Sequence, residues 1–164
     1  MEQLYHDGRI RAIGVSNFFP DRVMDFIMQH EIVPAVDPIE THPFHQQSAA
    51  HDFLRENGIQ HQSWGPFAEG QHGIFQNEQL RTIAEKHSRT VAQVILRWLT
   101  QREIVAIPKS VRKERMQENF NVFDFMLSSD DMEAIAQLDT NTSSFFDHRD
   151  PAMVKRLSGM QRET

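Results

Sequence analysis

The sequence predicts an α/β fold in which helices flank a parallel sheet. Short runs rich in Val and Ile alternate along the chain with stretches in which apolar residues recur at helical spacing. This alternation is typical of βαβ units, whose strands lie parallel to one another. No internal repeat or low-complexity segment divides the 164 residues. We therefore expect a single structural unit over residues 1–164.

Four strands are expected from the apolar runs. Each run is short, is rich in β-branched residues, and is followed by polar or turn-forming residues. The predicted strands are residues 10–15, 33–39, 59–64 and 104–107.

Helices are expected between and after these strands. Residues 1–8 have the pattern of the last turns of a helix closed by Gly8, and Pro20 lies in the first turn of the next helix. Thr90 and Gln93 have the spacing of a capping box before an apolar stripe, which predicts a helix over residues 90–101. A polar tail is expected to follow the last predicted helix. The remaining predicted helices are residues 47–57, 77–87, 113–120 and 128–138.

Composition favours a cytoplasmic protein. The chain has no cysteine and no apolar run approaching the ~20 residues that span a bilayer. Residues 1–8 lack the basic flank and apolar core of a targeting peptide. The net charge of -6 at pH 7 argues against nucleic acid or an anionic membrane as the main partner.

Three sets of residues at strand ends suit ligand binding. Ser16 and Asn17 follow the first strand and could hydrogen-bond an amide, or simply cap a turn. Trp64 ends the third strand and could stack on a flat heterocycle, or belong to the core. Basic residues after the fourth strand meet a helix N-terminus, which suits a phosphate dianion; a solvated basic helix end is the alternative.

Two other polar sets are weaker candidates. Asp37 and Glu40 could act as acid and base, and His42 with His45 could suggest a metal site. A lone His-x-x-His in a loop lacks the remaining metal ligands, and the His42-Pro43 pair is explained as turn structure. We expect neither acid-base chemistry nor metal binding from these residues.

Taken in order, the motifs resemble the second half of the aldo-keto reductase family, in its bacterial 2,5-diketogluconate-reductase-like branch. That family is a (β/α)8 barrel that reduces carbonyls with NADPH. A complete barrel of this type has eight strands in about 250 residues, so the resemblance implies a partial barrel of about four C-terminal βα units that lacks the N-terminal strands. The resemblance extends from residue 1 to about residue 151, and is carried by residues 8–18, 34–44, 62–70 and 107–115.

The resemblance implies an NADP(H) site whose nicotinamide end lies near the first and third predicted strands. Ser16 and Asn17 would hold the nicotinamide carboxamide. Trp64 would stack on the nicotinamide ring, and Gly65 and Phe67 would lie near the pyrophosphate.

The adenosine end of the implied site lies after the fourth predicted strand. Lys109, Ser110 and Arg115 match the positions that grip the 2'-phosphate of NADPH. Glu118 and Asn119 match the positions that contact adenine.

Two positions depart from the family pattern. Arg112 replaces a small polar residue and could add a further cation to the phosphate site. Asp37-Pro38 stands where the family usually has Asn-Gln, and that glutamine contacts the carboxamide. Pro38 has no side-chain donor, so we expect this contact to be lost or replaced.

The resemblance also places the family's catalytic tyrosine, aspartate, lysine and histidine upstream of the Ser16-Asn17 strand. Nothing around Tyr5, the one tyrosine of the chain, resembles the tyrosine motif. We therefore expect a C-terminal fragment, starting at an internal methionine, that is inactive alone. The alternative is a noncatalytic nucleotide-binding or self-associating half barrel. Because half a barrel exposes two sheet edges, it should pair with a second copy or with a separately made first half.

Overall fold

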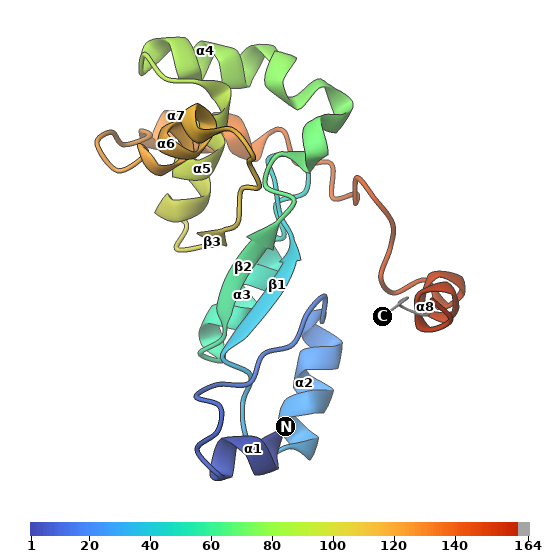
Figure 1. Ribbon diagram of the computed structural model, residues 1–164. Helices are drawn as coiled ribbons and strands as arrows, with labels where there is room; N and C mark the ends of the chain where they lie inside the picture. The colour runs from blue at the N-terminus through green and yellow to red at the C-terminus, as the bar shows by residue number, and fades with distance from the viewer. Residues whose placement is uncertain (161–164) are drawn as a thin grey trace.

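The computed structural model describes residues 1–160, in which three parallel strands pack against helices (Figure 1). The strands are β1 (Val36–Glu40), β2 (Gln60–Trp64) and β3 (Val105–Ala106), and they lie in the order β1-β2-β3. Glu40 at the end of β1 lies opposite Trp64 at the end of β2. The carboxyl ends of these two strands are therefore side by side, and both strands point upward in Figure 1.

The prediction of a first strand over residues 10–15 is wrong. This segment forms only an isolated parallel bridge, between Gly14 and Val36. It still follows β1, because the Val15 N–H donates to the Val36 carbonyl at 3.0 Å. A Cβ at Gly14 would lie 2.7 Å from the Val36 side chain, so the close approach depends on glycine. Among residues 1–160 the segment has a neighbour on one side only, and a regular ladder does not form.

Two of the remaining strands differ from their predicted bounds. β1 begins at Val36 and not at residue 33, because Pro34 has no N–H to donate to a ladder. β3 covers only two residues of the predicted range 104–107, immediately before the turn that contains Pro108. The third predicted strand is confirmed as β2.

The helices predicted from capping signals are confirmed. α5 (Val91–Gln101) begins with a capping box, in which the Gln93 N–H donates to Thr90 Oγ1 at 3.2 Å and the Gln93 side chain accepts the Thr90 N–H at 3.1 Å. The other confirmed helices are α1 (Glu2–His6), α2 (Pro20–Gln29), α3 (Ser48–Glu56), α4 (Glu78–Lys86), α6 (Lys113–Phe120) and α7 (Ser129–Ala136).

Two elements were not predicted. The 3-10 segment η1 (Ala68–Gln76) is interrupted by residues with positive φ, so it has no regular helical period. The tail expected to be simply polar contains α8 (Pro151–Ser158). Asp150 caps α8 by accepting the Ala152 N–H at 2.9 Å, and Pro151 occupies its first turn. The Asp-Pro pair is thus a local signal for this helix.

Two cores hold the helices to the sheet. The larger core packs α4, α5 and α7 together and includes Leu80, Ile95 and Ile135. In the smaller core Ile39 of β1 packs with Val23 of α2 and Leu54 of α3. Ile39 faces these helices. Because side chains alternate along a strand, the residues before and after Ile39 in β1 point to the opposite face of the sheet.

The β3 edge and α6 expose apolar side chains. β3 pairs only with β2 among residues 1–160. Val105 and Ile107 are 47% and 52% exposed, and on α6 Met116 and Phe120 are 50% and 78% exposed. Within residues 1–160, no helix has both the length and the apolar character to cross a bilayer.

Candidate functional site

Ser16, Asn17 and Trp64 meet at the carboxyl end of the sheet. The Trp64 Nε1–H donates to Asn17 Oδ1 at 2.7 Å, and Asn17 Nδ2 donates to Ser16 Oγ at 3.2 Å. Asn17 has a φ of 57°, in the left-handed region that asparagine tolerates better than most residues. The two hydrogen bonds fix which way the Asn17 amide points, with its oxygen toward the indole.

The Asp37-Pro38 pair lies directly beside this group, with its side chains on opposite faces of β1. The Pro38 carbonyl accepts the Asn17 N–H at 3.0 Å, which ties the turn to the strand. Asp37 is fully buried; its Oδ1 accepts the Phe18 N–H at 3.4 Å and its Oδ2 has no partner. Burial raises the pKa of Asp37 to about 7. Asp37 is therefore enclosed behind the strand, out of reach of a ligand at its end.

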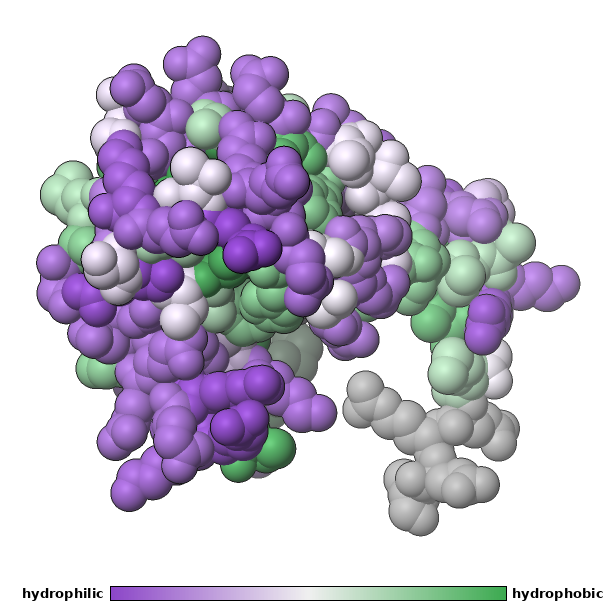
Figure 2. Space-filling view, turned by 90° about the horizontal axis from the view of Figure 1, so that it is seen from above, coloured by the Kyte–Doolittle hydropathy of each residue, from purple (hydrophilic) through white to green (hydrophobic). Residues whose placement is uncertain are grey.

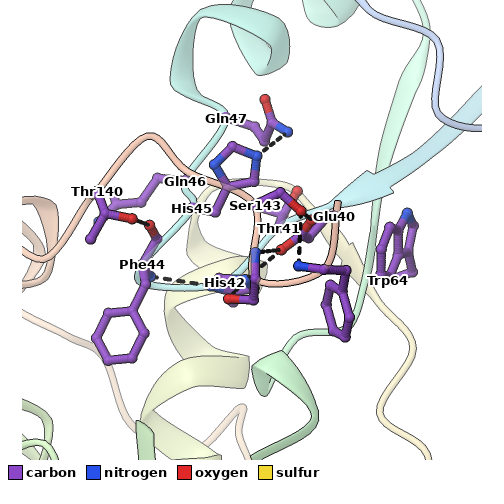
Figure 3. Close-up of polar contacts among 12 residues, drawn as sticks. Glu40, Thr41, His42, Phe44, His45, Gln46, Gln47, Trp64, Thr140 and Ser143 are labelled. Carbon is purple, nitrogen blue, oxygen red and sulfur yellow. Dashed lines mark hydrogen bonds and ion pairs between the residues drawn. The ribbon is translucent and has the colours of Figure 1, made fainter. Parts of the chain in front are cut away.

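A network around Glu40 joins β1 to residues 140–149, which we call the C-terminal strap (Figure 3). The Phe44 N–H donates to His42 Nδ1 at 3.3 Å, so the ring proton is on Nε2, which donates to Glu40 Oε1 at 2.9 Å. Ser144 Oγ lies 3.2 Å from that same nitrogen. A Ser-His-carboxylate relay needs the serine and the carboxylate on different ring nitrogens, so this group is not a catalytic triad.

The strap covers part of the Trp64 ring. The ring centroids of Phe145 and Trp64 are 5.2 Å apart, and those of His148 and Trp64 are 6.0 Å apart. A pocket of about 270 Å³ lies between the strap and the end of β1, and it reaches Asn17. The nicotinamide end of the predicted site is thus bordered by a segment that sequence reasoning did not connect to it.

The predicted adenosine-end residues gather around a second pocket, of about 430 Å³. The turn after β3 and the helix α6 form one wall, and the N-terminus of α5 with η1 forms the other. The lining residues are Phe67, Phe75, Thr90, Val91, Ala92, Lys109, Ser110, Arg115, Glu118 and Asn119. Seen from the carboxyl ends of the strands, the surface is largely hydrophilic around apolar patches (Figure 2).

Two hydrogen bonds define the walls of this second pocket. The Thr90 hydroxyl donates to Glu118 Oε1 at 2.5 Å, which connects the start of α5 to α6. Ser110 Oγ accepts the Arg112 N–H at 3.2 Å and shapes the turn that leads into α6. Within residues 1–160, neither Lys109 nor Arg115 forms an ion pair, so both cations are available to an anion.

Of the residues predicted to lie near the phosphate groups, two do not line the second pocket. Arg112 occupies the N-cap position of α6 and does not line it. Gly65 faces the strap, because a Cβ at this position would lie 3.4 Å from the Phe145 ring. Gly65 has a φ of +62°, which lets the chain turn between Trp64 and Phe67, and so between the two ends of the predicted site.

The histidines after β1 are held by neighbouring polar groups. His42 Nε2 bonds Glu40, and His45 Nε2 lies 2.9 Å from Gln47 Nε2. Among residues 1–160, no three His, Asp or Glu side chains are grouped to hold a metal ion.

Comparisons with known proteins show the family of the chain. The profile of the Aldo/keto reductase family matches residues 1–140. The chain belongs to the aldo/keto reductase family. It is 46% identical over 138 residues to the glyoxal reductase of Bacillus subtilis (strain 168), which covers 84% of this chain and 49% of that protein. This aldo/keto reductase chain spans about half the length of the curated relatives it matches.

Solved aldo-keto reductases share its fold. MGS-M4, an aldo-keto reductase from a Medee basin deep-sea metagenome library, matches with a TM-score of 0.87 at 39% identity, over 91% of this chain and 55% of that one. A mutant of Gox0644 in complex with NADPH matches with a TM-score of 0.82 at 42% identity, over 87% of this chain and 52% of that one. The three parallel strands therefore correspond to part of a larger aldo-keto reductase fold.

Proposed function

We propose that this chain forms the NADP(H)-binding part of an NADPH-dependent aldo-keto reductase, which reduces a carbonyl to an alcohol by hydride transfer. The observation that carries the proposal is the convergence of Lys109, Ser110 and Arg115 on one pocket at the start of α6. Two cations, a hydroxyl and a helix N-terminus suit the 2'-phosphate that distinguishes NADPH from NADH.

The rest of the pocket suits the adenosine that carries this phosphate. Phe67, Phe75 and Val91 give it apolar and aromatic walls, and Glu118 and Asn119 add polar groups that can bond a base edge. Its volume of about 430 Å³ falls within the range of roughly 300–1,000 Å³ that is usual for small-molecule sites. We infer that adenosine and its 2'-phosphate provide most of the binding free energy.

The nicotinamide end is proposed to lie beside Trp64 and Asn17. The indole offers a flat face for stacking, and the Asn17 amide is held in one orientation by the indole N–H. Pro38 offers no side-chain donor at the neighbouring position, so the carboxamide has one anchor fewer than in the family pattern. Bound NADPH would supply the hydride, and these residues would orient its ring.

The proton donor is proposed to come from beyond this chain. A carbonyl that accepts hydride beside Trp64 also needs a proton from a nearby acid. Tyr5 lies in α1, which contacts residues preceding β1 through the Glu2 carboxylate and the Glu31 N–H, and thus sits at the amino end of the sheet (Figure 1). Trp64 lies at the carboxyl end, so Tyr5 cannot serve, and we expect this chain to show no turnover alone.

The exposed β3 edge supports the proposal that a partner completes the sheet. Val105 and Ile107 present apolar side chains beside unpaired strand backbone, and an apolar pocket of about 270 Å³ next to them is lined by Met116 and Phe120. A separate polypeptide carrying the family's N-terminal strands fits this edge, and so does a second copy of the chain. The second possibility keeps open a noncatalytic, self-associating half barrel as the alternative function.

Calorimetric titration with adenosine 2',5'-bisphosphate and with adenosine 5'-monophosphate tests the proposal. We expect the 2'-phosphate to improve the affinity at least tenfold, because two free cations face the pocket. Equal affinities would contradict a 2'-phosphate site. Carbonyl-dependent NADPH oxidation by the chain alone would contradict the proposed absence of a proton donor.

A further inference from the structure

The carboxylate of Glu40 is the buried attachment point of the C-terminal strap. Glu40 ends β1 and is 4% exposed. Its Oε2 accepts the Ser143 hydroxyl at 2.5 Å and its Oε1 accepts the Ser144 N–H at 2.7 Å, from residues more than one hundred positions along the chain. With the bond from His42, three donors surround one carboxylate (Figure 3). Only an acceptor with no N–H of its own satisfies all three.

The ionisation of Glu40 agrees with this arrangement. Burial raises the pKa of Glu40, but the hydrogen bonds from His42, Ser143 and Ser144 outweigh burial and hold the pKa below its usual range. Glu40 is therefore a carboxylate at neutral pH, and charge-assisted hydrogen bonds of this kind are the stronger class.

The same serine that binds Glu40 also shapes the strap. Ser143 Oγ accepts the N–H groups of Phe145 and Phe146, each at 3.0 Å. The resulting turn directs the Phe145 ring onto Trp64, with the centroids 5.2 Å apart. The chain of contacts thus runs from the Glu40 carboxylate through Ser143 to Phe145 and the indole.

The other attachments of the strap are more exposed. At its start, the Thr140 N–H and hydroxyl both donate to the Phe44 carbonyl, at 2.9 and 2.7 Å. At its end, Arg149 pairs with Asp21 at 2.6 Å, but the two side chains are 54% and 65% exposed. Exposed ion pairs contribute little because solvent screens them. Glu40 is the attachment nearest to Phe145 and the one that is shielded from water.

We propose that Glu40 is a positioning residue that holds the C-terminal strap against Trp64 and so fixes the indole for the nicotinamide. The role of the indole rests on the proposed NADP(H) function, whereas the attachment of the strap does not. The indole is then fixed at two places, by Asn17 at its N–H and by Phe145 at its ring.

Hydrogen exchange and fluorescence quenching of Glu40→Gln test the attachment without any cofactor. The glutamine amide places an N–H against one of the three donors, so at least one hydrogen bond to the strap is lost. Amide hydrogen exchange in residues 143–149 should therefore accelerate at least tenfold. Acrylamide should quench the fluorescence of Trp64 more strongly in the variant. Trp98, the other tryptophan, contributes little to this quenching because it is 1% exposed. Ser143→Ala should accelerate the same peptide, and Ser143→Thr, which keeps the hydroxyl, should restore slow exchange.

Asp131→Asn is a matched control. Asp131 is also 4% exposed and accepts hydrogen bonds from Lys86, His87 and Ser128, but it joins α7 to α4. Asp131→Asn should change the rate of amide hydrogen exchange in the strap by less than twofold. Unchanged strap exchange in both Glu40→Gln and Ser143→Ala would overturn the proposal. Equal acceleration in Asp131→Asn would also overturn it, because the effect would then reflect general loss of stability.

A cofactor titration separates this proposal from the proposed function. Glu40→Gln should weaken NADPH binding about fivefold and leave adenosine 2',5'-bisphosphate binding unchanged. Faster strap exchange with unchanged NADPH affinity would overturn the positioning of the indole. If the unaltered chain binds neither nucleotide, the proposed function fails, while the exchange experiment still decides whether Glu40 holds the strap.

Discussion

The indole N–H of Trp64 donates a 2.7 Å hydrogen bond to the side-chain oxygen of Asn17. This bond joins the end of β2 to the turn beside β1, and so couples the proposed stacking residue to the proposed carboxamide anchor. Neither side chain can rotate without breaking the bond. The geometry of the nicotinamide end therefore depends on a contact between two residues that are 47 positions apart.

Trp64→Phe should weaken NADPH binding several-fold while leaving adenosine 2',5'-bisphosphate binding unchanged. Phenylalanine keeps an aromatic face but cannot donate to Asn17, and loss of one such bond costs about 1 kcal/mol. Calorimetry with both ligands measures the difference. An equal loss for the two ligands would mean that the indole supports the whole site and not one end of it.

Asp37→Asn should stabilise the chain at pH 8. The folded-state pKa of Asp37 is raised to about 7, so above that pH the fold bears the cost of an ionised, half-unpartnered carboxylate. A shift from 3.8 to about 7 corresponds to roughly 4 kcal/mol as an upper estimate. Urea unfolding at pH 8 measures the gain. A variant no more stable than the original chain would show that Asp37 is better solvated than its burial indicates.

The Asp37→Asn variant should also reveal how His61 makes the stability of the fold sensitive to acid. Burial lowers the folded-state pKa of His61 to about 3, so His61 stabilises the fold above its unfolded pKa of about 6.5 and loses this contribution as the pH falls. Asp37 has the opposite dependence, because its stabilising protonated form is gained as the pH falls from about 7 to 4. In Asp37→Asn, stability should therefore fall between pH 6 and 4 more steeply than in the unaltered chain, by up to about 1.4 kcal/mol per pH unit.

Urea unfolding at several pH values between 4 and 7 measures both slopes. Replacing His61 by Asn in the Asp37→Asn background should flatten the profile again. Identical slopes in the unaltered chain and in Asp37→Asn would contradict the assigned pKa of Asp37.

Local signals predicted most of the helices, because caps depend on residues three positions apart. Thr90 with Gln93 specified the start of α5 in this way. The strand expected at residues 10–15 failed, since a strand requires partners that the local sequence does not report. The bond between Glu40 and Ser143 was missed for the same reason, because 103 positions separate the two residues.

The structure brings the predicted site residues together where one short segment carries several of them. Lys109, Ser110 and Arg115 lie on a single turn and helix, so their spacing alone brings them to one pocket. Arg112 shares that segment but occupies the N-cap of α6, outside the lining. Its side-chain direction depends on where the helix begins, which the motif did not specify.

Val105→Lys should reduce association through the β3 edge. Val105 is 47% exposed on a strand that pairs on one side only within residues 1–160. A charge on an open edge opposes strand pairing. Sedimentation velocity over a range of concentrations should show a concentration-dependent larger species that this variant diminishes. A monomer at all concentrations would contradict self-association and leave a separate N-terminal half as the proposed partner.

The NADPH-to-NADH affinity ratio of Arg115→Ala is the sharpest test of the proposed 2'-phosphate site at the start of α6. Arg112→Ala is the matched control, because Arg112 lies on the same segment but outside the pocket. We expect the unaltered chain to prefer NADPH, and Arg115→Ala to reduce this preference about tenfold or more, as loss of a charged contact of roughly 1.5–3 kcal/mol predicts. Arg112→Ala should reduce it less. No preference for NADPH in the unaltered chain, or an equal effect of the two variants, would show that Arg115 does not bind a 2'-phosphate.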